Sequence, residues 1–221
     1  ACLGHFMAPF DDGAFIVSFR EGSKKDGTDP HSRNAASLGL SRDGAKTWFY
    51  AYIYGAGNGK LGAIASEELD IPKSQFAKVG GQLRRQFEKG LPALGTLVER
   101  VKLKAKSHGY LMSLDKHRIP TRSLHSALNT LCQSAGAIIM KKALIILDHK
   151  LQVALQLKPG VDYEFMLNIH DEWQIEARSE EIAIAVGNAG CEAITEAGEH
   201  FNFRCPLSGS YDIGDNWADT H

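Results

Sequence analysis

Two runs of alternating side chains meet at a polar centre within residues 165–177, FMLNIHDEWQIEA. Phe165 and Leu167 alternate with other residues before the centre, and Trp173 and Ile175 do so after it. A period of two places the apolar side chains on one face of an extended strand, so the sequence predicts a β-hairpin here. Because longer segments carry a helical period, we expect a fold of the α+β class.

The rest of the chain is mostly helical in pattern. Ser41 is a suitable N-cap for a helix over 42–54, which the following glycines would end. Apolar residues three or four apart predict a helix from about 72 to 106, bent near Pro92. The other expected elements are a loop at 22–34, a short hairpin or loop at 109–122, one long apolar helix at 123–151 and a helix at about 179–199.

Charge and cysteine content exclude several classes of protein. The 25 Lys and Arg and the 26 Asp and Glu give a net charge of -1, so a polyanion site must be local. The four cysteines include no C-x-x-C pair, which indicates neither a disulfide framework nor a zinc knuckle. The longest apolar runs are far shorter than the roughly 20 residues of a membrane helix, so we expect no membrane partner.

Two cations and two aromatic residues stand four apart on the predicted helix 42–54. Arg42, Lys46, Tyr50 and Tyr54 would form one slowly winding stripe. Ammonium and guanidinium groups suit a triphosphate, and aromatic rings suit stacking on bases. The alternative is a solvated basic turn followed by tyrosines of the core.

Acidic side chains occupy the tip of the predicted hairpin 165–177. Asp171 and Glu172 follow His170, where a carboxylate can be exposed and still held firmly enough for a hard divalent cation. Adjacent strand residues point to opposite faces, so the pair supplies only part of a metal site. The alternative is an ordinary polar turn.

Polar residues also mark the apolar helix 123–151. His125, Asn129 and Gln133 are four apart and would line one edge of it. Their partners would be either internal groups or the minor-groove acceptors that all base pairs share.

A locally basic strip precedes that helix. Residues 100–122 hold seven Lys or Arg and a single acid, Asp115. Such a strip suits a phosphate backbone, and the alternative is a solvated helix end and loop.

Taken together, these motifs resemble the family A, or polymerase I type, DNA polymerases, and among them the replicative polymerases of podovirus-like phages. RDGAKTWFYAYIYGAG (42–57) is similar to the fingers helix called motif B. NIHDEWQI (168–175) is similar to motif C, and HSALNTLCQSAG (125–136) to the palm helix that touches the minor groove. The resemblance implies a right-hand polymerase fold, with helical fingers at 1–107 and the C-terminal part of an antiparallel-sheet palm at 108–221.

The resemblance implies that this chain takes part in template-directed DNA synthesis. Arg42, Lys46 and His31 would contact the incoming dNTP, and Tyr50 would stack near its sugar. A Tyr at that position goes with poor rejection of dideoxynucleotides in the family. Tyr54 would hold the template base position.

Further residues would contact the DNA primer-template and the metal. The expected minor-groove residues are His125, Asn129 and Gln133. Asp171 would bind one of two Mg2+ ions, and Glu172 and His170 would support the primer terminus. With Arg42 and Lys46, the two acids complete the expected catalytic set.

One part of the family pattern, motif A, is not found in the sequence. Its Asp, which completes the magnesium cage, would lie just before CLGHFMA. We therefore expect a partner, an N-terminal polymerase chain that carries motif A, the thumb and an exonuclease. Cys2 is compatible with a protein-splicing junction near that point. The expected location is the cytoplasm of a phage-infected bacterium.

Two other functions are alternatives to an enzyme component. A catalytically silent module that binds primer-template or nucleotide would also account for the missing carboxylate. A single-subunit RNA polymerase shares the right-hand plan, but Tyr50 followed by Ala51 does not match the Met expected there.

Overall fold

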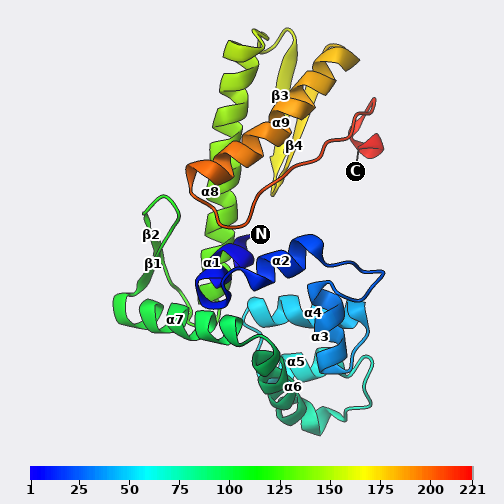
Figure 1. Ribbon diagram of the computed structural model, residues 1–221, viewed down its shortest axis with the longest axis vertical. Helices are drawn as coiled ribbons and strands as arrows, with labels where there is room; N and C mark the ends of the chain where they lie inside the picture. Colours follow the sequence, from blue (N-terminus) through cyan, green and yellow to red (C-terminus); the bar gives the residue numbers. More distant parts are fainter. Residues whose placement is uncertain (221) are drawn as a thin grey trace. The chain divides into compact units, whose positions relative to one another are not determined.

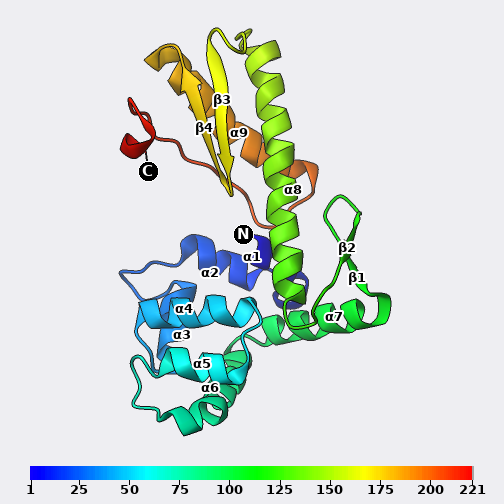
Figure 2. The ribbon, with the colours of Figure 1, turned by 180° about the vertical axis from the view of Figure 1, so that it is seen from behind.

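A computed structural model describes residues 1–220, and Figures 1 and 2 show its ribbon from two sides. The chain divides into two compact units, which we treat separately. The first unit is Cys2–Gln133, and the second begins at Ser134 and also takes in Ala1. The division falls inside helix α8 (Ala127–His149). The assignment of fingers and palm to 1–107 and 108–221 stays a prediction.

Among the described residues, the first unit consists of seven complete α-helices, the 3-10 helix η1 (Lys73–Gln75), the start of α8 and a small hairpin. Its core surrounds α4, where the rings of Trp48, Tyr52 and Phe87 pack with centroids 5.1 to 5.8 Å apart. These three rings are almost fully buried. The elements are α1 (Cys2–Asp11), α2 (Ala14–Glu21), α3 (Pro30–Leu38), α4 (Arg42–Ile53), α5 (Asn58–Ala65), α6 (Phe76–Gly90), α7 (Pro92–His108), β1 (Tyr110–Met112) and β2 (Arg118–Pro120).

Three boundaries in this unit differ from the sequence prediction. The predicted loop 22–34 is too long, because α3 begins at Pro30 with Asp29 as its N-cap. The predicted helix 72–106 is two helices, since the chain breaks at Leu91 and restarts at Pro92. Residues 109–122 contain the antiparallel β1–β2 hairpin, as one of the two predicted alternatives had it.

The second unit holds the C-terminal part of α8, a π-helical turn η2 (Lys150–Ala154), strands β3 (Tyr163–Ile169) and β4 (Glu172–Ala177), and helix α9 (Glu180–His200). Figure 2 shows the hairpin beside α9. Apolar side chains of both strands pack with Leu147 and Val186 in one buried cluster. The chain is therefore an α+β protein, as predicted, with two antiparallel hairpins among mostly helical elements.

The predicted hairpin 165–177 is confirmed, although its alternation is interrupted. The register shifts between Phe165 and Leu167, which is an irregularity of the β-bulge kind. Phe165 faces the buried cluster, whereas Leu167 is 45% exposed. The prediction that both residues share the buried face is wrong for this reason.

Helix α8 begins at Ala127, so the predicted start at residue 123 is wrong. Ser123 forms a turn instead, because its hydroxyl accepts a hydrogen bond from the backbone N–H of His125 at 3.2 Å. His125 therefore precedes the helix, and only Asn129 and Gln133 lie on it.

One helix in the described part of the chain, Ala127–Ala154, is long and apolar enough by length and composition to cross a membrane. Core helices of soluble proteins pass the same test. Its buried residues include Ala135, Ile139, Ala143 and Leu147, which repeat every four positions. The predicted absence of a membrane partner stays a prediction.

Candidate active site

The predicted stripe of cations and aromatic rings lies on the solvent side of α4. Lys46 is exposed, and the side chains of Tyr50 and Tyr54 are 45% and 55% exposed. The opposite side of the helix carries the buried residues Ala45, Trp48, Phe49 and Tyr52. The alternative of core tyrosines is therefore wrong for these two positions. Tyr54 follows the last residue of α4 as its C-cap.

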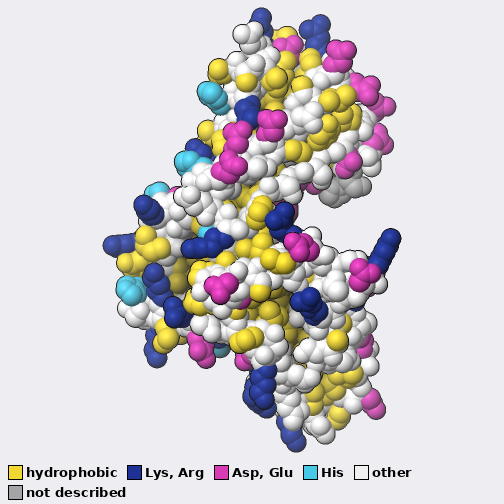
Figure 3. Space-filling view, in the orientation of Figure 1, with side chains coloured by type: hydrophobic (Ala, Val, Ile, Leu, Met, Phe, Trp, Pro, Cys, Tyr) yellow, Lys and Arg dark blue, Asp and Glu magenta, His cyan; other side chains and the backbone are white. Residues whose placement is uncertain are grey.

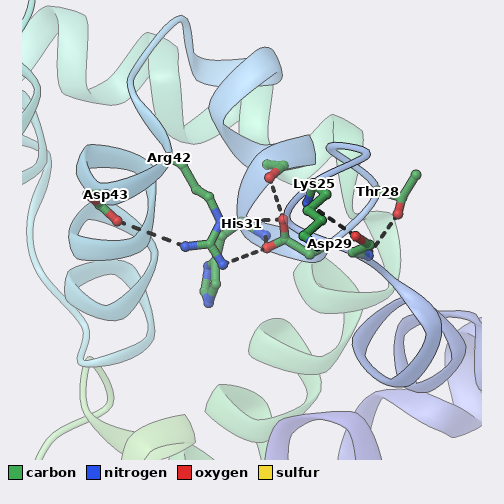
Figure 4. A network of polar contacts seen from close by, with 8 residues as sticks. Lys25, Thr28, Asp29, His31, Arg42 and Asp43 are labelled. Carbon is green, nitrogen blue, oxygen red and sulfur yellow. Dashed lines mark hydrogen bonds and ion pairs between the residues drawn. The ribbon is translucent and has the colours of Figure 1, made fainter.

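Arg42 is held at the start of this stripe by a carboxylate that the sequence analysis did not single out. Its Nη2 donates to Asp29 Oδ1 at 3.1 Å, and its Nε lies 3.4 Å from Asp29 Oδ2. Figure 4 shows this network, in which Asp29 also accepts from the backbone N–H of His31 at 3.1 Å. The Ser32 hydroxyl donates to the same carboxylate. Asp29 thus has two roles: it caps α3 and it holds the Arg42 guanidinium in place.

The charge of Asp29 is strongly favoured in the folded chain. Burial raises the pKa of its carboxyl group, but the hydrogen bonds from Ser32, Arg42 and the His31 backbone, with the Arg42 charge, lower it to about 2. Asp29 is therefore ionised at neutral pH. It offsets part of the positive charge of Arg42 while the site holds no anion.

His31 joins the stripe from the first turn of α3. Its ring contacts Phe49 edge-on, with centroids 5.6 Å apart, and lies 6.0 Å from the Tyr50 ring. Burial and then the charge of Arg42, with that of Lys46, lower the pKa of the imidazole, against a smaller opposing effect of Asp29. Its Nδ1 is buried without a hydrogen-bond partner among the described residues. The ring is thus neutral at pH 7.

A second carboxylate fixes the start of α4. The Ser41 hydroxyl accepts from the backbone N–H of Gly44 at 3.0 Å and donates to Glu68 Oε1 at 2.5 Å. The backbone N–H of Ser41 donates to the other oxygen of Glu68, also at 2.5 Å. These bonds lower the pKa of Glu68. The Ser41 cap and the Glu68 carboxylate together fix the N-terminus of α4, on whose first turns Arg42 and Lys46 lie.

The end of α4 lies against the segment that precedes α8. Gly55 has a φ of +85°, and a Cβ at that position would lie 2.1 Å from the carbonyl oxygen of His125. Only glycine permits this approach. A small cavity at this point is lined by Gly55, His125 and Arg84. The Arg84 guanidinium donates a hydrogen bond to the Ala56 carbonyl and lies 5.3 Å from the centroid of the Tyr52 ring.

The three predicted minor-groove residues are only partly brought together. Asn129 is half-buried and Gln133 is exposed, one helical turn apart on α8. His125 is exposed in the turn before the helix, so the prediction that it shares the helix with them is wrong. All three belong to the first unit.

In the second unit, the acidic residues sit where the sequence predicts. His170 and Asp171 form the two-residue turn between β3 and β4, since Ile169 pairs with Glu172. His170 has a φ of +55°, and the Asp171 side chain is exposed with no hydrogen bond or ion pair to residues 1–220. Glu172 is half-buried and accepts a hydrogen bond from the Gln174 amide.

We call residues 170–172 the acidic turn. Its carboxylates offer oxygen ligands of the type that Mg2+ prefers, but they are few. Within residues 1–220, no group of three His, Cys, Asp or Glu side chains is placed to hold a metal ion. Asp171 offers one such oxygen ligand.

Two positioning residues were missed by sequence reasoning. Asp29 did carry a signal, because Asp followed by Pro is a common start of a helix. Glu68 carried none, since its partner Ser41 is 27 residues away. Chemically, the face of α4 offers two cations, a neutral imidazole and an exposed aromatic ring to an anionic ligand with a planar or apolar part.

Comparisons with known proteins show which proteins this chain is similar to. The family model for DNA polymerase family A matches residues 11–219. The DNA-directed DNA polymerases of Enterobacteria phage T3 and Escherichia phage T7 are 38% and 37% identical to the chain over 240 residues, which cover all of the chain and 32% of each relative. The chain thus spans about a third of the length of these relatives.

A solved structure has a similar fold. The POL domain of Pol1 from M. smegmatis, in complex with DNA primer-template and dNTP, matches with a TM-score of 0.65 at 18% identity. The match covers 88% of this chain and 35% of that one. The predicted polymerase fold is thereby confirmed.

Proposed function

The chain belongs to DNA polymerase family A, and on that basis we propose that it carries part of the active site of a template-directed DNA polymerase. In this proposal a primer 3′-hydroxyl attacks the α-phosphate of a dNTP in line, and pyrophosphate leaves. The observation that carries it is the grouping of His31, Arg42, Lys46 and Tyr50 on one solvent face.

The α4 face would bind the nucleotide. Lys46 and Arg42 offset the charge of the triphosphate and of the leaving pyrophosphate. His31, neutral before binding, donates a hydrogen bond or takes up a proton beside the phosphates. Tyr50, whose exposed ring lies 6.0 Å from the His31 ring, would lie next to the sugar. Tyr54 occupies the template base position at the end of the helix.

Several polar residues of the chain would contact DNA. His125, Asn129 and Gln133 contact minor-groove acceptors, which do not distinguish one base pair from another. His170 supports the primer terminus. The M. smegmatis neighbour is a complex with primer-template and dNTP, which supports the same partners for this chain.

The acidic turn would take part in metal binding. Asp171 is the proposed Mg2+ ligand in this chain, with Glu172 beside it. Magnesium ions, when bound, supply the positive charge that offsets the growing charge on the phosphoryl group and lower the pKa of the 3′-hydroxyl.

Residues beyond this chain would complete the site. The curated phage relatives are about three times as long, which supports a partner segment with motif A, the thumb and an exonuclease, encoded separately or in a longer form of the protein. Similarity to phage polymerases also supports a location in the cytoplasm of a phage-infected bacterium.

A second candidate function is a catalytically silent module that binds primer-template or nucleotide. It is favoured by one observation, that residues 1–220 place no three potential ligands around a metal position. In that case DNA binds and no extension follows under any condition.

Extension of a labelled primer separates the two functions. The chain is incubated with primer-template, Mg2+ and four dNTPs, alone and mixed with a polypeptide that carries motif A and the thumb of a phage T7-like polymerase. We expect extension only in the mixture. Steady binding of primer-template without extension in every mixture would contradict the polymerase function and support the silent module. Extension by the chain alone would show that the motif A partner is not needed.

A further inference from the structure

Residues 100–122 form a cationic surface that the proposed active site does not use. We call it the basic strip; its cations are Arg100, Lys102, Lys104, Lys106, Lys116, Arg118 and Arg122. They lie on the C-terminal half of α7, on the β1–β2 hairpin and just after it. Figure 3 shows Lys and Arg side chains gathered over these elements.

The charge of the strip is not neutralised internally. None of its seven cations forms an ion pair with an acid within residues 1–220. Its single acid, Asp115, is engaged by the Ser113 hydroxyl and by the His117 ring at 3.0 Å. The chain as a whole has a net charge of -1, so the rest of it is acidic overall. The strip is thus a local attractor for anions on a protein whose overall charge is slightly negative.

Two of the cations are held in place by aromatic rings. The Arg118 guanidinium lies over the Tyr110 ring, 4.7 Å from its centroid, and the Arg100 guanidinium lies 5.0 Å from the Phe10 centroid. His108 contacts the same Tyr110 ring from its edge. The strip therefore presents fixed as well as flexible charges along α7 and the hairpin.

The surroundings of the strip favour a phosphate backbone over bases. Tyr110, the one Phe, Trp or Tyr within residues 100–122, is half-buried and covered by Arg118 and His108, so it offers no open face on which a base could stack. Binding by cations without stacking fixes the position of a duplex and carries no sequence information.

From these observations, and resting on the proposed polymerase function, we infer that the basic strip binds the phosphate backbone of duplex DNA. It adds a contact outside the residues of α4, α8 and the acidic turn. An acidic segment of another protein is the other ligand that this charge would attract, and the half-exposed apolar residues Leu103 and Met112 lie nearby.

The salt dependence of DNA binding tests the inference. Anisotropy of a labelled 20-base-pair duplex is measured with the chain between 50 and 200 mM NaCl. The strip variant carries Lys104→Gln, Lys106→Gln and Arg122→Gln, three exposed residues without a hydrogen-bonded side chain in the described part. The control carries the same loss of charge at exposed residues elsewhere in the first unit, as Lys24→Gln, Lys78→Gln and Lys89→Gln. Circular dichroism verifies the helical content of both.

Each phosphate contact contributes about 0.9 to the slope of log K against log salt on duplex DNA. Loss of three contacts lowers the slope by up to ~2.7, so the rise in Kd over this fourfold salt range becomes about 40-fold smaller for the strip variant. The control should keep the parent slope.

Each of the following results would overturn the inference. If the strip variant keeps the parent slope, the strip does not bind DNA while the proposed function stands. If it also loses binding of a labelled oligo-glutamate peptide that the parent binds, the strip serves an acidic protein partner. If the parent itself does not bind duplex at 50 mM NaCl, the proposed function fails together with the inference.

Discussion

Asp29→Asn removes the charge that anchors Arg42 and keeps an oxygen that can cap α3. In the parent, Asp29 accepts bonds from Arg42, Ser32 and the His31 backbone, and its pKa is about 2 against 3.8 for the free group. A shift of this size corresponds to about 2.4 kcal/mol at 1.36 kcal/mol per pKa unit. The Arg42 side chain is 30% exposed, so solvent screening lowers the expected loss to ~1 to 1.5 kcal/mol at pH 7.

The pH dependence identifies the cause of that loss. The folded pKa of Asp29 lies below the unfolded value, so its contribution to stability is fully present above about pH 4 and disappears as pH falls toward 2. The difference in free energy of unfolding between parent and variant should therefore be constant from pH 5 to 8 and shrink below pH 4.

Urea unfolding followed by tryptophan fluorescence measures the effect, because Trp48 is fully buried in the same unit. Asp26→Asn, at an exposed position in the loop before α3, is the matched control and should change stability by less than about 0.5 kcal/mol. If Asp29→Asn were as stable as the parent at pH 7, or if its loss of stability persisted unchanged at pH 2.5, the charge of Asp29 would not be the source of the stabilisation.

Three further predictions concern the same unit. Gly55→Ala should destabilise the chain by at least about 2 kcal/mol in thermal unfolding, because φ at this position is positive and the added Cβ would meet the backbone of His125. The control Gly59→Ala in α5 should be neutral or stabilising. Equal melting temperatures of the two variants would contradict the close approach of Gly55 to His125. Tyr50→Phe in the assembled polymerase should restore discrimination against dideoxynucleotides, and an unchanged chain-termination pattern would place Tyr50 away from the sugar. The dNTP affinity should rise as pH falls from 8 to 6. The pKa of His31 is lowered in the free chain, and the negative charge of a bound triphosphate should raise it, so that the ring takes up a proton on binding. Calorimetry in buffers of different ionisation enthalpy should detect this proton uptake, and its absence would show that His31 does not contact the phosphates.

Local signals predicted the elements that carry the site. The motif B helix was placed to within one residue because a cap, Ser41, and a terminating glycine, Gly55, bracket a helical period. The acidic turn was placed because two alternating runs flank it. The start of α3 was missed because the Asp29–Pro30 signal lies within a polar, glycine-containing stretch typical of a loop.

What the sequence did not reveal depends on contacts between distant segments. The pairing of Arg42 with Asp29 and of Ser41 with Glu68 joins residues 13 and 27 positions apart, and no local rule specifies such partners. The β-bulge that exposes Leu167 leaves the alternating pattern intact, so the pattern alone could not predict it. Family membership and the polymerase fold were predicted from the motifs and are confirmed, while the roles of the single site residues stay predictions.

The proposed function requires that Asp171 take part in the catalysis of templated nucleotide addition. Its most direct test is single-turnover incorporation of one correct dNTP by the chain assembled with an N-terminal polymerase segment, comparing the parent, Asp171→Ala and the control Asp212→Ala, which alters an exposed acid of the C-terminal segment. We predict a rate loss of at least about a thousandfold for Asp171→Ala, with duplex affinity within a few-fold of the parent, and no loss for the control. Equal rates for Asp171→Ala and the parent would contradict the account.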